Sequence, residues 1–346
     1  MSRPVHLLFL SDTHLGFDDP LRPRSRARHR GSDFFAMYLR VLEVARSERP
    51  DAIIHGGDLL FRSRVPDSLV DRAMAPLVAL ADEGLPVFMV AGNHERSFLP
   101  RTLFTLHEHV HIFDEPRTVR MTINGIRLAV GGFPCVRQGA RDSFRRLVAA
   151  TGLESEPSDV RVLCIHQLVE GARVHGHQFR GGEDVVRASD LPRDVTAILS
   201  GHVHRSQVLR TDLSGKPLPA PVVYSGSTER TSFAEASEAK GFVSILAGPA
   251  ESPARALRSI RFRRLPARPM YVRTLSPGPL PTALARFRSS LSEVDAGGVL
   301  QVRIPSELAS GYAGIVATVK AIVPPTMFLS FRLPSGSEGF SGSSRS

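Results

Sequence analysis

The sequence predicts an α/β fold built on a mostly parallel sheet, with a second sheet packed against it. Short apolar runs of the kind that form buried strands recur between Val5 and Ser200. Helical patterns separate the first three runs, and a strand–helix–strand order is typical of parallel sheets. An Asn124-Gly125 pair lies between two further strand patterns and indicates a type I′ hairpin, which points to the second sheet.

Each element follows from its local pattern. The buried strands are predicted at VHLLFL, AIIH, PVFMV, VRVLCI and TAILS. Residues 33–49 and 68–83 carry apolar side chains at helical spacing and predict two helices. Residues 117–133 predict the hairpin. The stretches 215–233 and 240–247 predict further strands, which strengthens the case for a second sheet.

The composition changes near Pro266, where a proline-rich stretch marks a linker or a short strand. Beyond it, helical and strand patterns alternate as far as Leu333, and a stretch rich in Ser and Gly follows. We therefore predict a main domain at 1–264, a small C-terminal α+β capping domain at 265–333 and a disordered tail at 334–346.

Charge and composition narrow the range of partners. The formal net charge of +10 suits a polyanion such as nucleic acid. The alternative is a genome that favours arginine, because Lys216, Lys240 and Lys320 are the only lysines. Cys135 and Cys164 do not make a disulfide framework and indicate a reducing compartment. Because neither a signal peptide nor a run of membrane-spanning length is found, we expect a cytoplasmic protein with no membrane partner.

Polar side chains stand at the end of each predicted buried strand. They are Asp12 and His14, Asp58, Asn93 and His94, His166, and His202 with His204. In parallel α/β folds, ligands bind beyond the carboxyl ends of the strands. Two divalent cations about 3.5–4 Å apart need a bridging carboxylate, with nitrogen and oxygen ligands in the remaining positions. The pattern therefore predicts a site for two metal ions.

The ligands divide into two sets around one bridge. Asp58 is the predicted bridging ligand. The remaining ligands of one metal ion are Asp12, His14 and His204, and those of the other are Asn93, His166 and His202. A set of nitrogen and oxygen donors without a thiolate favours manganese, iron or zinc, and the number of histidines argues against magnesium alone. We expect two divalent cations, with Mn²⁺ as the first choice.

His94 is left without a metal in this scheme. Beside the ligand Asn93, it could reach the leaving oxygen of a substrate, either as a general acid or as a cation that stabilises developing charge. The alternative is a histidine that only braces Asn93. We predict His94 and Asp58 as the catalytic residues.

The order Asp-x-His, Gly-Asp, Gly-Asn-His, His, Gly-His-x-His resembles that of the calcineurin-like metallophosphoesterase superfamily. The resemblance covers Leu7 to about Leu246. It implies a four-layered α/β/β/α sandwich that hydrolyses phosphoesters. A metal-bridging hydroxide would attack phosphorus in line, and His94 would assist the leaving group.

Residues 224–245 are similar to the segment that follows the last motif in SbcD-type DNA repair nucleases, and so are RSRVP and the predicted cap. This resemblance implies DNA as substrate and partner, with the cap helping to position DNA over the metals. Candidate substrate contacts are Arg64, His175, His177, Ser227 and Arg230. The alternative interpretation places these residues at the surface or in a hydrogen-bonded turn.

Two departures from that branch leave other functions open. The stretch LLFRSR after the Gly-Asp motif lacks a second catalytic histidine, and the helical segment that docks on an SMC-like (SbcC-type) ATPase is expected to be missing or reduced. An ATPase partner and a homodimer therefore stay open. The alternatives to a DNA exonuclease or endonuclease are a small-molecule or cyclic-nucleotide phosphodiesterase or phosphatase, and a non-catalytic scaffold that binds DNA ends.

Overall fold

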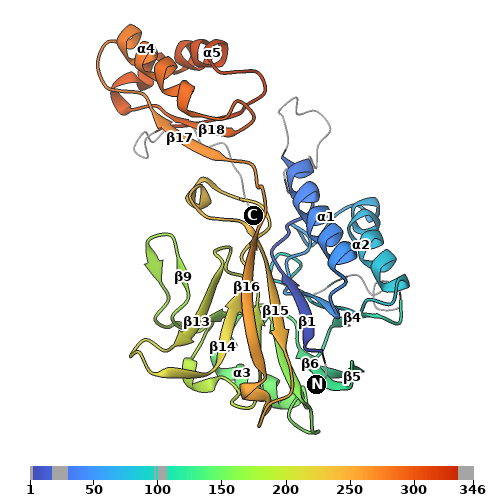
Figure 1. Cartoon of the computed structure of the whole chain (residues 1–346). Coiled ribbons are helices and arrows are strands. Elements are labelled where there is room, and N and C mark those ends of the chain that lie inside the picture. Colours follow the sequence, from blue (N-terminus) through green and yellow to red (C-terminus); the bar gives the residue numbers. More distant parts are fainter. Residues whose placement is uncertain (1–2, 18–29, 97–98, 100–106, 334–346) are drawn as a thin grey trace. The chain divides into compact units, whose positions relative to one another are not determined.

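The computed structural model describes residues 3–17, 30–96, 99 and 107–333. The chain forms two compact units (Figure 1), one made of Met1–Thr231 with Glu238–Ala267 and the other of Ser232–Ser237 with Arg268–Ser346. The predicted Ser/Gly tail at 334–346 lies outside the described residues. Among the helices that are described, none is long and apolar enough to cross a bilayer.

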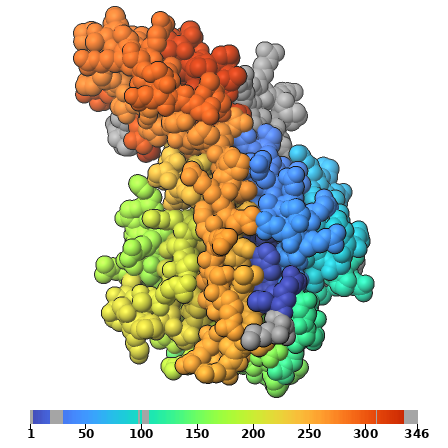
Figure 2. All heavy atoms as spheres, viewed as in Figure 1, coloured from blue at the N-terminus to red at the C-terminus, as the bar shows by residue number. Residues whose placement is uncertain are grey.

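The first sheet of the first unit has six strands. Their order is β16 (Leu257–Arg264), β15 (Gly241–Ala247), β1 (Val5–Leu10), β2 (Ala52–His55), β3 (Val87–Val90) and β4 (Val110–Phe113). Strands β1 to β3 are parallel, as predicted, and β4, which the sequence did not predict, is parallel to β3; β15 runs antiparallel to β1 and β16 antiparallel to β15. Figure 2 shows β16, in orange, at the surface, where it exposes Arg258, Arg261 and Arg264.

The second sheet also has six strands. Their order is β13 (Gln207–Thr211), β14 (Pro217–Tyr224), β12 (Ala197–Ser200), β7 (Val160–Ile165), β6 (Ile126–Gly132) and β5 (Arg117–Ile123). The predicted hairpin between β5 and β6 is confirmed, because Asn124 and Gly125 both adopt positive φ angles, as a type I′ turn requires. The predicted strand at 240–247 is observed as β15, but its assignment to the second sheet was wrong, because β15 pairs with β1 of the first sheet.

The first unit has four layers of secondary structure, namely helices, two sheets and a further helix, and an apolar core lies between each pair of adjacent layers. Helices α1 (Gly31–Glu48) and α2 (Asp67–Asp82) cover one face of the first sheet (Figure 1), where Leu8 and Leu10 of β1 point. The alternate residues Leu7 and Phe9 face the second sheet, because successive strand side chains point to opposite faces. Helix α3 (Ala140–Ala150) packs on the outer face of the second sheet. The expected α/β/β/α sandwich is the observed fold.

The second unit contains a small parallel sheet. Strands β17 (Met270–Thr274), β18 (Val299–Arg303) and β19 (Phe328–Arg332) lie side by side, and α4 (Leu280–Ser290) and α5 (Tyr312–Ile322) connect them. Phe287, Leu300 and Ile315 belong to a core of its own. The parallel pairing follows from the helical crossovers, which return the chain to the same end of the sheet.

Candidate metal centre

The predicted donors lie on loops that follow parallel strands of both sheets. Asp12 and His14 follow β1, Asp58 follows β2, Asn93 follows β3, His166 follows β7, and His202 and His204 follow β12. The loops after β1 and β2 are joined directly, because Asp12 N–H donates to the Gly57 carbonyl at 2.9 Å and His14 N–H to the Asp58 carbonyl at 3.0 Å. His202 N–H from the second sheet donates to Asp12 Oδ1 at 3.1 Å. The carboxyl ends of both sheets therefore bring their donors to one place.

Several donor residues have a backbone conformation that side chains disfavour. The φ angles of Asp12, His14, Asp58 and His202 are 53°, 46°, 55° and 84°. A residue other than glycine held in this left-handed region costs on the order of 1–3 kcal/mol. The hydrogen bonds between the loops hold these conformations and aim the side chains inward.

Asp12, His14 and His204 form the first cluster of donors. Their ligand atoms lie within 4.8 Å of one another. His14 Nε2 is 2.9 Å from His204 Nε2, and His204 Nε2 is 3.9 Å from Asp12 Oδ1. The buried His14 Nδ1 has no hydrogen-bond partner among the described residues. Two ring nitrogens that face each other beside a carboxylate offer lone pairs to one cation.

Asn93, His166 and His202 form the second cluster. The Asn93 side-chain oxygen is 2.9 Å from His166 Nε2 and 2.8 Å from His202 Nδ1. His166 Nδ1–H donates to the Gly56 carbonyl at 2.7 Å, which leaves Nε2 as the atom that faces the site. A backbone acceptor that fixes the other ring nitrogen is typical of metal-binding histidines.

Asp58 lies between the two clusters. A carboxylate oxygen of Asp58 lies within 4.8 Å of ligand atoms of His14 and His94 in one group, and of Asp12 and His166 in another. Asp58 is thus near His14 of the first cluster and His166 of the second. Burial opposes ionisation of Asp58, but the neighbouring His166, followed by His14 and His94, holds the pKa below its usual value. Asp58 is therefore a carboxylate with access to both clusters. The donors present fit two divalent cations.

His94 borders the site without belonging to either predicted ligand set. Its backbone N–H donates to Asp58 Oδ1 at 2.9 Å, and its Nδ1–H donates to the Phe61 carbonyl at 2.9 Å. These bonds leave Nε2 directed at the site, 4.0 Å from Asp58 Oδ2, on a side chain that is 34% exposed. The ring is thus held in place and still accessible to a substrate.

Glu95 is a residue of this site to which the sequence analysis gave no role. Its buried carboxylate accepts the N–H groups of Gly92 at 2.7 Å, Leu60 at 2.7 Å and Asp58 at 3.2 Å. Burial, with the charge of Asp58 adding to it, raises the pKa of Glu95 to about 7. Glu95 therefore joins the loops after β2 and β3. A signal was present, because an acidic residue three positions after Gly92 can accept a backbone N–H as in a capping box.

The predicted substrate contacts fall into two groups. Ser227 and Arg230 are buried in the loop after β14, where Ser227 N–H donates to the His204 carbonyl at 3.1 Å and the Arg230 guanidinium donates to the Glu238 carbonyl at 2.7 Å. Arg64, His175 and His177 are exposed. His177 contacts Phe179 edge to face, and both histidines lie on the hairpin of β9 (Arg173–Val174) and β10 (His177–Gln178). The first group supports a ligand loop, whereas the second lies at the surface.

Comparison with known proteins agrees with this geometry. The model of the calcineurin-like phosphoesterase family matches residues 5–206, which include every predicted metal ligand. The chain is similar to the DNA double-strand break repair protein Mre11 of Methanococcus maripaludis, with 22% identity over 251 residues that cover 68% of this chain and 60% of that protein. For the protein of the same name from Haloferax volcanii, the identity is 29% over 239 residues, covering 68% of this chain and 47% of the relative.

Among solved structures, the chain is similar to a dimetal phosphatase from Danio rerio, with a TM-score of 0.45 and 13% identity over 70% of this chain and 93% of that one. The curated relatives are thus matched over about half of their length, whereas the family model spans more than half of the 346 residues. The chain belongs to the calcineurin-like phosphoesterase family.

Proposed function

We propose that this chain hydrolyses the phosphodiester bonds of DNA at a centre of two divalent cations, with Mn²⁺ as the first candidate. The observation that carries the proposal is that carboxylate, amide and imidazole donors from both sheets gather in two adjoining clusters, with Asp58 near a histidine of each. Support for DNA comes from the net charge of +10 and from relatives whose name is that of a DNA double-strand break repair protein.

Each donor has a role in this proposal. Asp58 would be shared by both cations, Asp12, His14 and His204 would hold one of them, and Asn93, His166 and His202 would hold the other. When bound, the two cations activate water as a nucleophile and stabilise negative charge on the phosphoryl oxygens. The Gly56 carbonyl keeps His166 Nε2 turned toward the site by accepting the Nδ1 proton.

His94 acts on the leaving group. The Phe61 carbonyl orients its ring through Nδ1–H, so Nε2 meets the substrate. As an imidazolium, the ring donates the Nε2 proton to the departing oxygen, or stabilises the charge that develops there. The second unit is proposed to help position DNA. Association with an SMC-like ATPase or with a second copy of the chain is a separate proposal that follows from the SbcD-type resemblance.

The test is cleavage of end-labelled linear duplex and single-stranded DNA by the purified chain with Mn²⁺. Asp58→Ala is the inactive variant and Asp71→Ala, an exposed residue of α2, is the matched control. We expect cleavage by the wild type and the control, and a loss of at least about a thousandfold in Asp58→Ala. Without this carboxylate the site would not hold both cations, whose stabilisation of transition-state charge is worth several kcal/mol. Hydrolysis of bis-p-nitrophenyl phosphate without any cleavage of DNA would contradict the proposal and favour a small-molecule phosphodiesterase.

A further inference from the structure

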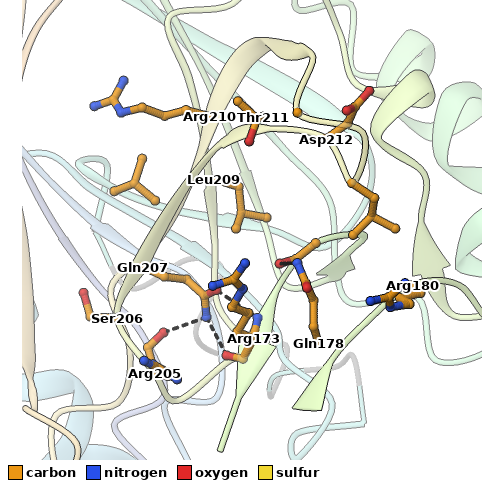
Figure 3. A pocket seen from close by; sticks show the side chains of 14 residues that line it. Arg173, Gln178, Arg180, Arg205, Ser206, Gln207, Leu209, Arg210, Thr211 and Asp212 are labelled. Atoms are coloured by element: carbon orange, nitrogen blue, oxygen red, sulfur yellow. Dashed lines mark hydrogen bonds between the residues drawn. The ribbon is translucent and has the colours of Figure 1, made fainter. Parts of the chain in front are cut away.

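A pocket of about 500 Å³ opens in the first unit next to the last metal-ligand loop. One wall is the segment that starts at Arg205, includes β13 and ends at Gly215, and the other is the β9–β10 hairpin. Figure 3 shows Arg173 and Gln178 of the hairpin near Gln207 and Leu209 of β13. Arg205, which lines the pocket, directly follows the predicted metal ligand His204, so the Cα atoms of the two residues are about 3.8 Å apart.

The pocket is strongly basic. Arg173, Arg180, Arg205 and Arg210 line it, and all four side chains are exposed. Within the described part of the chain, none of their guanidinium groups forms a hydrogen bond or an ion pair. Asp212 is the acidic residue among those lining the pocket, and its Oδ1 already accepts hydrogen bonds from Ser214 and Lys216. The four cationic groups are therefore available to an anionic ligand.

Gln207 sets the distance between the two walls. Its side-chain oxygen accepts Arg173 N–H at 2.9 Å, and its Nε2 donates to the carbonyls of Arg173 at 2.8 Å and Arg205 at 3.2 Å. Figure 3 marks bonds from Gln207 to both neighbouring residues. Because β13 is an edge strand that pairs with β14 in its sheet, the Gln207 side chain joins the hairpin to that edge by hydrogen bonds.

We propose that this basic pocket binds the phosphate groups of a single nucleic-acid strand whose neighbouring bond lies at the metal centre. This inference rests on the proposed function. It adds the residues that would contact the DNA strand, which the proposed function leaves unassigned. Guanidinium groups bind phosphate through paired N–H donors, which explains why the lining is arginine with no carboxylate partner. The pocket's volume suits a few nucleotides of one strand rather than a duplex.

The spacing of the arginines agrees with a nucleic-acid strand that runs from the metal centre along β13. Extended polypeptide advances about 3.4 Å per residue, so Arg205 and Arg210 lie up to roughly 17 Å apart. One strand carries a phosphate for about every 3.4 Å of helix axis in its duplex form, and the phosphates of an unpaired, extended strand lie further apart. Arginines at the two ends of this stretch can therefore meet two phosphates of the same nucleic-acid strand.

The test measures binding of a fluorescein-labelled oligothymidylate by anisotropy, without divalent cations so that no cleavage occurs, over a series of salt concentrations. The pocket variant is Arg173→Gln with Arg210→Gln. The control, Arg40→Gln with Arg146→Gln, removes the same charge from exposed arginines of α1 and α3. Each lost phosphate contact lowers the slope of log affinity against log salt by about 0.7, so the pocket variant should lose about 1.4 and the control nothing.

Each outcome decides between alternatives. Circular dichroism and thermal unfolding check that both variants fold, which is expected because these exposed side chains form no hydrogen bond or ion pair with any residue that the structure describes. An unchanged slope in the pocket variant, or an equal loss in the control, overturns the inference. Displacement of the oligonucleotide by thymidine monophosphate at equal phosphate concentration would assign the pocket to a free phosphate compound and also overturn it. Because binding is measured without catalysis, a failure of the proposed function remains distinguishable from a failure of the pocket.

Discussion

The metal centre and the basic pocket are neighbours in sequence, but the fold builds them in opposite ways. At the centre, Asp12, His14, Asp58 and His166 are buried, part of the backbone is held in unfavourable conformations, and Glu95 accepts three backbone N–H groups. At the pocket, the arginines are exposed and Gln207 is the side chain that joins its walls. This contrast agrees with the two proposed tasks, because chemistry on a phosphorus atom needs fixed donors, whereas binding a flexible polyanion needs only correctly spaced charge.

His94→Ala gives the largest effect that separates the two regions. We expect kcat to fall by about a hundredfold to ten-thousandfold, because a general acid contributes on that order. DNA affinity without metals should stay unchanged, since His94 is not part of the pocket. The checks are steady-state kinetics with Mn²⁺ and metal analysis, in which both cations should remain bound. Loss of one cation would show that His94 is itself a ligand.

Glu95→Gln tests how strongly the centre depends on its support. Glutamine keeps one side-chain oxygen and replaces the other with a donor, so at least one buried N–H at Gly92, Leu60 or Asp58 loses its acceptor. We expect the free energy of unfolding to fall by about 1–3 kcal/mol, the usual penalty for a buried unsatisfied group. Denaturant unfolding of the chain without metals is the measurement. Glu43→Gln on α1 is the surface control. An equal loss of stability in that variant would contradict the claim that Glu95 stabilises the chain by accepting buried N–H groups.

Gln207→Ala gives the smallest effect and concerns the pocket alone. Removing the side chain frees the hairpin from β13, so oligonucleotide affinity should drop a few-fold while stability changes by no more than about 1 kcal/mol. Anisotropy titration and thermal unfolding measure the two quantities. A large loss of stability without a change in affinity would mean that Gln207 serves the fold and not the pocket.

Much of the sandwich and the positions of the donors could be predicted from the sequence. Apolar runs of strand length identified β1, β2, β3, β7 and β12, and the carboxyl ends of parallel strands are where ligands collect. The Asn124-Gly125 pair was sufficient for the hairpin, because few other residues adopt two positive φ angles in succession. These signals lie within short stretches of the chain, so they can be recognised in the sequence without knowledge of the fold.

The remaining features depend on contacts between distant segments. Strands β15 and β1 pair although more than half of the chain separates them in sequence, and the hydrophobic pattern of a strand does not indicate which strand it pairs with. The role of Glu95 depends on N–H groups that the loop after β2 brings to it. Arg173 and Arg210 are exposed residues without a pattern of their own, so only the fold shows that they line one pocket.

The left-handed backbone at Asp12, His14, Asp58 and His202 has an evolutionary consequence. Glycine adopts this conformation without strain, so each such position has a mutation that would relax the backbone by on the order of 1 kcal/mol or more while deleting a donor. Selection for thermal resistance alone would therefore favour glycine at these positions and remove the predicted ligands. Selection for activity would oppose that change, in the usual conflict between stability and function.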